Sequence, residues 1–374
     1  MSANSLSSGL IAGVALLVST QVSFAIDADD FTRKILGYME SGGYEIGYAS
    51  ATASGDDVTI EGISAGINGI DGTVQLDSLT FEGVREDGDG GYDVRDLKPF
   101  DFTYTAPADG DNPAMDLSVS GITATNIHVP GGEAFSTPTD MMIAETASTG
   151  PVGLSIDGNT VFSAAGLQST TRQSDDGAQL DGNFSLDGLK FDLAAIPYPK
   201  ARQVLSAMGY EQVEGDITGA LSWNLADGTM EVSEYLTDLS GVGKLNFTFS
   251  ISGYTLQMIK DMQKMQAQMA AAADDANAQQ AMGLAAMGLL QQLTLNSIAI
   301  RFDDASVTDK VLGFIASQQG MSIDQFVQGL KGMMPLYLAA LQNPEFQQKV
   351  TTAVGEYLDH PKNRSLIFWL DRPL

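Results

Sequence analysis

The feature that most constrains the fold is a long region, from Tyr44 to Ile251, in which apolar and polar residues alternate. Alternation with a period of two residues is typical of strands that bury one face. Asp followed by Gly divides the region, for example at Asp176-Gly177 and Asp227-Gly228. Because Asp before Gly tolerates a positive φ, such pairs predict hairpin turns. The region is therefore predicted to form a mostly antiparallel sheet.

One strand pattern recurs with a slip in its alternation. In 184-FSLDGLKF-191 the slip falls at Asp187-Gly188, and four other segments have the same shape: 58-VTIEGISA-65, 74-VQLDSLTF-81, 117-LSVSGITA-124 and 293-LTLNSIAI-300. Their irregular spacing argues against a solenoid, which needs a fixed period. A two-residue turn suits Asp187-Gly188 but would leave very short arms. A β-bulge, in which one extra residue is absorbed, would instead return the apolar residues to one face.

Bulges also bend strands, so several bulged strands predict a strongly curved sheet with an apolar concave face. Chance recurrence of a short apolar pattern is the alternative interpretation. Under the first interpretation, the side chains expected to line a ligand groove on the concave face are Val74, Leu76, Leu79, Phe81, Phe184, Leu186, Leu189 and Phe191.

Helices are predicted in two short segments and in the last third of the chain. The short ones cover residues 30–40 and Pro199 to Met208, the latter ended by Gly209. An Ala/Gln/Met-rich stretch over 254–291 predicts two helices broken near 274–278.

The last third contains further helix start and stop signals. Ser306 is predicted to cap a helix that Gly320 ends, and Ser322 with Gln325 forms a capping box. Asn343-Pro344 predicts the start of the last helix, and Pro335 is expected to kink or split the one before it.

Two further strands are predicted within this helical part of the sequence, at 293–302 and 365–370, and they need a sheet to pair with. The expectation is therefore one large domain over 26–374, with a β-rich part (26–253) and a helical part (254–374). The fold class is α+β: a large, curved, mostly antiparallel sheet with bulged strands, covered by helices concentrated in the C-terminal third.

The N-terminal residues 1–25 are interpreted as a secretory signal peptide. They contain the short apolar run 10-LIAGVALLVS-19, and Ser23-Phe24-Ala25 fits cleavage after Ala25. The run is too short for an ordinary membrane span of about 20 residues. Lys and Arg are absent from these residues, which leaves open an uncleaved anchor or a misplaced start. The predicted location is periplasmic or secreted, with no transmembrane segment after cleavage.

Composition excludes several functions. The net charge of −28 repels nucleic acid and anionic lipid headgroups, and acidity alone is common among exported proteins. The absence of Cys excludes a thiol nucleophile and a zinc-thiolate site. The sequence indicates no cofactor.

Three motifs that could carry chemistry are weak. Gly62-Ile63-Ser64-Ala65-Gly66 matches a nucleophile elbow, but Gly, Asn and a hairpin follow where a helix is required. The loop 86-EDGDGGYD-93 places Asp87, Asp89 and Asp93 at alternate positions, a weak candidate for Ca²⁺, although a solvated hairpin loop is favoured. His128 and His360 are isolated in sequence and are interpreted as surface or capping residues.

Four methionines, Met258, Met262, Met265 and Met269, recur at helical spacing and form one stripe. Thioethers can bind Cu(I), but a core or groove-covering face is favoured, because Met fills irregular apolar space. An adaptable Met surface would also suit a lipid-like ligand, so these residues join the ligand-groove candidates.

The C-terminal portion resembles the bacterial YdgA-like envelope proteins of unknown function. The resemblance rests on 209-GYEQVEGDITGALSWNLADGTMEV-232, 293-LTLNSIAIRFDDASVTDKVLGFIASQQGMSIDQF-326 and 343-NPEFQQKVTTAVGEYLDHPKNRSLIFWL-370, and covers roughly 209–374. The N-terminal part is loosely similar to AsmA-type proteins, whose curved sheets form apolar grooves. The resemblance implies no catalytic residues.

The functional expectation is a non-enzymatic exported envelope protein whose curved sheet holds or helps transfer a lipid or another apolar ligand. One alternative is a structural or interaction protein, with an envelope partner, whose groove is filled by its own side chains. The other is an acidic carbohydrate-active enzyme, which would need two carboxylates about 5–10 Å apart across a cleft.

Overall fold

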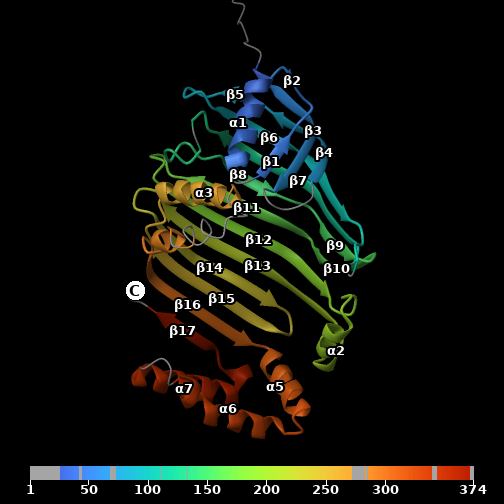
Figure 1. Ribbon diagram of the computed structural model, residues 1–374, viewed down its shortest axis with the longest axis vertical. Coiled ribbons are helices and arrows are strands. Elements are labelled where there is room, and N and C mark those ends of the chain that lie inside the picture. Colours follow the sequence, from blue (N-terminus) through green and yellow to red (C-terminus); the bar gives the residue numbers. More distant parts are fainter. Residues whose placement is uncertain are drawn as a thin grey trace, which may run out of the picture.

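The computed structural model describes residues 26–370, apart from 42–43, 68–72, 111, 133, 272–282, 284 and 339–342. The described residues form one sheet of 17 strands, and every strand pair is antiparallel (Figure 1). This confirms the predicted α+β fold with a large antiparallel sheet.

The strands are β1 (Tyr44–Gly47), β2 (Ser50–Ser54), β3 (Asp57–Ile67), β4 (Thr73–Glu82), β5 (Arg85–Glu86), β6 (Tyr92–Ala106), β7 (Met115–Val129), β8 (Ile143–Ser148), β9 (Val152–Ile156), β10 (Asn159–Ala164), β11 (Gly166–Gln173), β12 (Gln179–Asp192), β13 (Gln212–Asn224), β14 (Thr229–Leu239), β15 (Gly243–Ser252), β16 (Thr294–Asp304) and β17 (Leu366–Leu370). From β12 to β17, each strand pairs with the next in sequence. This part of the sheet is a meander, into which helical segments are inserted before β13, before β16 and before β17.

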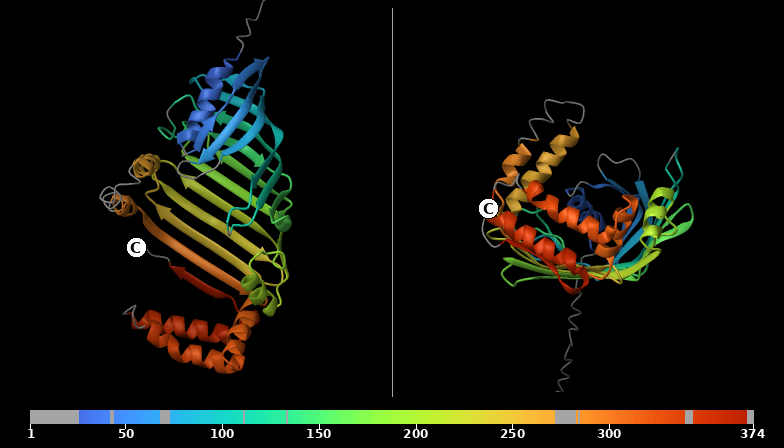
Figure 2. Two further views of the ribbon diagram at one scale, coloured as in Figure 1. Left: turned by 45° about the vertical axis from the view of Figure 1, so that its right-hand side comes forward. Right: turned by 90° about the horizontal axis from the view of Figure 1, so that it is seen from below.

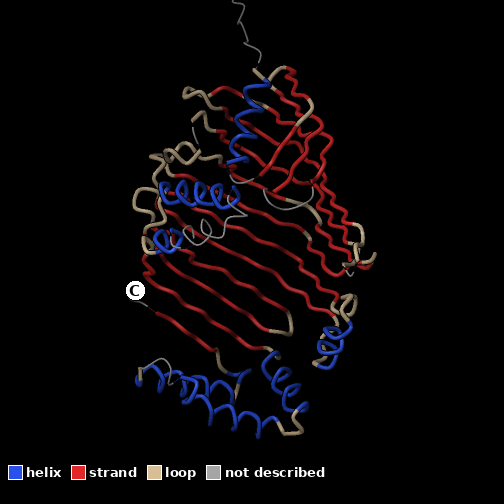
Figure 3. Tube along the Cα trace, in the orientation of Figure 1, coloured by secondary structure: helices blue, strands red, loops and turns tan. Residues whose placement is uncertain are grey.

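The helices are α1 (Ala28–Ser41), α2 (Pro199–Ala207), α3 (Leu256–Ala271), α5 (Val307–Gln318), α6 (Ile323–Leu338), α7 (Pro344–Asp359) and the 3₁₀ turn η2 (Pro361–Asn363). Seen from below, the sheet is a curved trough, and α3, α6 and α7 lie on the inner side of its curve (Figure 2). The C-terminal helices α5, α6 and α7 lie together below the edge strand β17 (Figure 3).

The predicted slip is a bulge in three of the five segments. In β12, Asp187-Gly188 opposes the single residue Asp216 of β13. In β7, Ser120-Gly121 opposes the single Asp101 of β6 in the same way. The two glycines have φ of 62° and 61°, and each donates its backbone N–H to the opposing carboxylate at 2.8 Å. In β16, Asn296 is the extra residue against β15.

The prediction of an extra residue is wrong for the pairing of β3 with β4. Glu61 pairs with Ser78 and Ile63 with Leu76, so the register does not shift. The reason is that the two slips lie opposite each other, Gly62 facing Asp77, and therefore cancel. Gly62 nevertheless has the positive φ of 62° found at the other two glycines.

Three long strands are broken at the point that faces one of these glycines. The breaks fall between β1 and β2, between β8 and β9, and between β10 and β11. At each break one backbone N–H donates to the carbonyl of the residue before the glycine: Ala49 to Glu61 at 2.9 Å, Gly150 to Ser120 at 2.7 Å and Ala165 to Asp187 at 2.8 Å. The slip is therefore a repeated local structure that bends two neighbouring strands together.

Most helix ends agree with the sequence, with two differences in the last third. The side chain of Ser306 makes no capping bond; the carboxylate of Asp304 accepts from the N–H of Thr308 at 2.9 Å instead. Pro335 lies inside α6 without splitting it, close to the end of the helix, where few later hydrogen bonds remain to be lost. The predicted break near 274–278 lies outside the described residues.

Candidate functional site

The face of the sheet that carries the helices is called here the inner face. At one end α1 packs on it, and a buried cluster that includes Phe31, Val58, Ile60 and Phe81 fills the space between helix and strands. Phe31 is fully buried, and its ring lies 5.1 Å from that of Phe81. This end is closed core.

The inner face of β13–β17, called here the open sheet, is built differently. Three rows of apolar side chains cross these strands in register: Leu221–Val232–Phe249–Ile298–Leu370, Phe247–Ile300–Phe368 and Leu245–Phe302–Leu366. None of these side chains is buried by the described residues. Leu245 is 43% exposed and Phe368 is 41% exposed, which is unusual for large apolar groups gathered on one face.

Helices cover only the two ends of the open sheet among the described residues. Leu256 and Ile259 of α3 pack against the buried cluster that contains Trp223 and Leu225. At the other end, the ring of Tyr357 on α7 lies 6.5 Å from that of Phe302. The rows between these two contacts form the apolar surface that is the candidate site.

The sequence-predicted groove residues fall in three environments. Phe81 is buried beneath α1, and Leu76 and Leu79 pack against the same cluster, so they belong to the closed core. Leu189 is also buried. Val74, Phe184, Leu186 and Phe191 are partly exposed.

Two of the partly exposed residues have defined neighbours. The ring of Phe191 lies 5.1 Å from that of Phe162, and both line a cavity of about 300 Å³. The ring of Phe184 lies 6.0 Å from that of Tyr235, above Gly219, which pairs with both residues. A Cβ at Gly219 would come within 2.1 Å of the Phe184 ring, so the absence of a side chain lets the aromatic ring lie flat there.

The methionine stripe on α3 is divided between two environments. Met258 is buried, Met265 is partly exposed, and Met262 and Met269 are exposed. The helix therefore presents only part of its stripe to the sheet, and the remaining thioethers face solvent.

The strands of the open sheet contain site residues that sequence reasoning missed. The alternation of Leu245, Phe247, Phe249 and Ile251 was enough to predict a strand. The alternation does not predict the register, which aligns these residues with the apolar side chains of β16 and β17. The closing segment 366-LIFWL-370 carries the strongest local signal.

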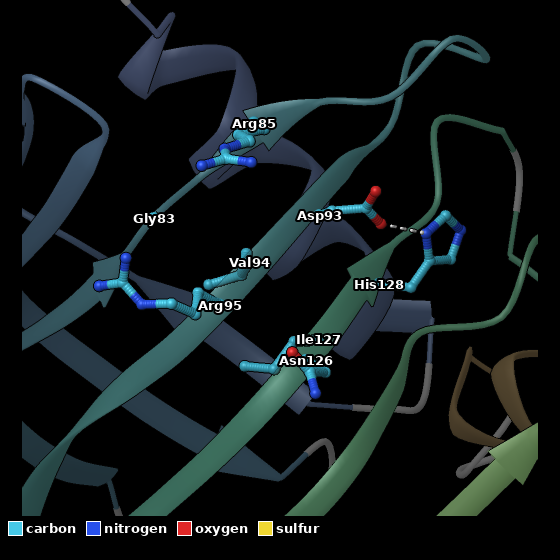
Figure 4. A pocket seen from close by; sticks show the side chains of 8 residues that line it. All are labelled: Gly83, Arg85, Asp93, Val94, Arg95, Asn126, Ile127 and His128. Carbon is cyan, nitrogen blue, oxygen red and sulfur yellow. Dashed lines mark hydrogen bonds and ion pairs between the residues drawn. The ribbon is translucent and has the colours of Figure 1, made fainter.

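A separate cavity of about 390 Å³ lies among β6, β7 and the segment before β6 (Figure 4). His128 Nδ1 is 3.1 Å from Asp93 Oδ1, and Arg85 and Arg95 complete the charged lining. The described lining residues include no Ser, Thr, Cys or Lys to act as a nucleophile beside this pair. Asp93, Arg95 and His128 alternate with the buried Val94 and Ile127, so they point away from the core.

The remaining sequence motifs lie in ordinary strands, turns and helix ends. Ser64 lies inside β3, without the strand–turn–helix that a nucleophile elbow requires. The Asp87 carboxylate accepts from the N–H groups of Asp89 and Gly91 at 2.9 and 2.7 Å, as expected for a turn. No group of three or more His, Asp or Glu side chains within the described ranges is arranged to hold a metal ion. His360 is the C-terminal cap of α7.

Two residues with shifted pKa values contact each other where α1 meets β6. Asp30 accepts from Lys34 Nζ at 2.5 Å and from the Tyr92 hydroxyl at 2.8 Å. The hydrogen bond from Lys34 holds the pKa of the Asp30 carboxyl below its usual value. Burial, followed by the hydrogen bond to Asp30, raises the pKa of Tyr92 far above its usual value. The network anchors α1 on the closed end of the sheet.

A protein-family model described as "uncharacterized protein" matches residues 236–368, which include the end of β14, all of β15 and β16, the start of β17 and the C-terminal helices. No curated protein matches the chain. None of the described helices is long and apolar enough to cross a membrane.

Proposed function

We propose that this chain is a non-enzymatic, exported envelope protein whose open sheet holds, or helps transfer, a lipid or another apolar molecule. The observation that carries the proposal is the set of three aligned apolar rows on β13–β17, none of whose side chains is buried by the described residues. Fully burying one large apolar side chain contributes about 1.5–3 kcal/mol, so covering several half-exposed ones is a substantial driving force.

The shape of the surface favours a long, flexible ligand. The rows extend across neighbouring strands, which lie about 4.8 Å apart, so the apolar surface is elongated across the sheet. Acyl chains match such a surface because they need no hydrogen-bonding partners. The resemblance to YdgA-like and AsmA-type proteins, and the export expected from residues 1–25, fit the same proposal.

A structural or interaction role is the second candidate, because an exposed apolar surface also suits a protein partner. The exposed side chains of β17 favour it. Among the described residues this strand pairs with β16 alone, and Ile367 and Trp369 on its other face are 52% and 66% exposed. An unpaired, apolar edge strand can add a strand from another chain.

The test is extraction of the purified full chain and mass spectrometry of the extract, followed by titration with a fluorescent fatty acid. Co-purifying lipid and saturable probe binding are expected. Leu245→Glu places a charge on the inner face and should weaken binding at least about tenfold, since a charge among acyl chains is strongly unfavourable. Ile367→Glu is the matched control on the opposite face and should bind as the parent does.

Absence of lipid together with absence of probe binding would exclude the proposal. Equal loss in Leu245→Glu and Ile367→Glu would also exclude it, because the inner face would then have no special part in binding. A protein partner captured through β17, with Ile367→Glu but not Leu245→Glu defective, would favour the interaction role.

A further inference from the structure

A cavity of about 370 Å³ lies between α1, α3 and the residues Pro130, Gly132 and Ala134. Its lining includes Gly37 and Tyr38 of α1, Pro130 of the connecting segment, and Gln263 of α3. These segments are far apart in sequence and are joined by packing: the Tyr38 ring lies 5.4 Å from that of Phe135. Burial raises the pKa of Tyr38, in agreement with this packing.

The described residues that line this cavity carry a charge opposite to that of the protein. Arg33, Lys34, Lys260 and Lys264 all line it, and its described lining residues include no Asp or Glu. The whole chain has only 19 Lys and Arg against 47 Asp and Glu. Four cations around one cavity therefore stand out in a protein whose overall field repels anions.

The four cations are not equivalent. Lys34 donates to Asp30 and to the carbonyl of Gly90, at 2.5 and 2.6 Å, and is held in the α1 network. Arg33 makes one bond to Asp30, at 2.9 Å, which leaves most of its guanidinium donors available. Lys260 donates to Ser136 at 2.9 Å. Lys264 is exposed and has no ion-pair partner among the described residues.

We infer that this cavity binds a phosphate group, with Lys264 and Arg33 as its principal charged contacts. Guanidinium and ammonium groups form strong charge-assisted hydrogen bonds with phosphate oxygens. Lys34 contributes charge but is already held by Asp30 and Gly90.

The volume and the position of the cavity suggest what the phosphate carries. A cavity of this size falls in the range of small-molecule sites and exceeds what a bare phosphate fills. Phe135, which contacts Tyr38 at its wall, also packs on the buried cluster at the α3 end of the open sheet. A phosphate-bearing lipid could therefore place its headgroup here, whereas free phosphate would need the cations alone.

Calorimetric titration of the purified full chain tests the inference with two probes: inorganic phosphate, and a short-chain phosphatidic acid below its micellar concentration. Two variants change the cavity. Lys264→Glu reverses one exposed charge, and Gly37→Glu introduces a carboxylate where a Cβ would meet nothing within 4 Å. Each should lower affinity at least about tenfold, the value of one charge-assisted hydrogen bond.

Two matched controls separate the site from general effects. Gly37→Ala adds the side-chain stem without charge, and Lys200→Glu makes the same charge reversal on the exposed α2. Both should bind as the parent does. Tight binding of phosphatidic acid with weak phosphate binding identifies a headgroup site, and comparable binding of the two identifies a free-phosphate site.

Failure of both probes to bind the parent chain would overturn the inference. Unchanged binding in Lys264→Glu and Gly37→Glu would overturn it as well. Neither result bears on the open sheet, because the fatty-acid titration with Leu245→Glu measures that surface separately.

Discussion

The two ends of one sheet handle the same kind of apolar face in opposite ways. Under α1, Phe31, Val58 and Ile60 are fully buried. On β15–β17, residues of the same type and the same alternation, such as Phe249 and Ile300, remain partly exposed. Antiparallel pairing and apolar alternation are shared, so the difference comes from α1, which covers the strands at one end, while the apolar rows at the other end are left partly exposed by the described residues. The comparison teaches that the curvature of the sheet gives both ends their shape. Whether the apolar side chains of an end are buried core or an accessible surface depends on whether a helix covers them.

The largest expected effect separates the two ends by stability. Phe31→Ala removes a fully buried ring with edge contacts to Phe81 and Tyr92, and should cost about 3–5 kcal/mol in the free energy of unfolding. Phe249→Ala on the open sheet should cost less than about half of that, because the ring is already partly hydrated. Urea denaturation of both variants measures the difference, and equal costs would show that the open sheet is core.

The next effect concerns the repeated bulge. Gly188→Ala forces a Cβ into the left-handed region and to within 3.0 Å of the Ala165 Cβ. We expect a loss of about 2–3 kcal/mol, the sum of backbone strain and contact. Gly55→Ala is the matched control, because Gly55 has a φ of 69° but nothing within 4 Å. Its cost in the free energy of unfolding should be about 1–2 kcal/mol. An equal cost at both sites would show that the close approach of Gly188 to Ala165 does not contribute to the loss of stability.

A smaller effect is the pH dependence of the closed end. The pKa of Asp30 is lowered in the folded state, mainly by Lys34. Its contribution to stability is therefore present above the unfolded pKa, near 4, and is lost as the pH falls through the lowered folded pKa. Asp30→Asn should cost about 1 kcal/mol or less at neutral pH and should flatten the acid limb of the stability curve. If the stability of the variant fell with decreasing pH as steeply as that of the parent, Asp30 would not be the source of this pH dependence.

An equally small effect is expected on the stability of the open sheet. Leu245 is 43% exposed, so Leu245→Glu should change the free energy of unfolding by only about 1 kcal/mol while weakening probe binding at least about tenfold. Thermal unfolding followed by circular dichroism provides the comparison. A loss of several kcal/mol would mean that the side chain is part of a core and that lost binding reflects unfolding.

Much of the fold was predictable because strand patterns and helix caps are local. Asp187-Gly188 could be interpreted as a bulge from the slip in its own strand. The cancelled slips at Gly62 and Asp77 could not, since a register shift belongs to a pair of strands, and the sequence does not say which strands pair. The cap of α5 shows the same limit, because Ser306 and Asp304 are both suitable and only the backbone geometry selects Asp304.

The sequence predicted an apolar surface on one face of the sheet, but it named only some of the strands that leave such side chains exposed. The alternating apolar residues around Leu79 and Leu189 have the same sequence pattern as those of β15 and β16. Whether such a set is covered depends on a helix that is distant in the chain, as Phe31 is from Phe81. The basic cavity drew no prediction, because Arg33 and Lys264 come together only through the packing of α1 near α3.

The most direct test of the open sheet is photo-crosslinking with a fatty acid that carries a diazirine in its acyl chain, followed by mapping of the labelled peptides. The expected result is label on β13–β17, with loss of that label in Leu245→Glu and its retention in Ile367→Glu. Label spread evenly over the chain, confined to the strands beneath α1, or absent altogether would contradict the proposal that the open sheet is the binding surface.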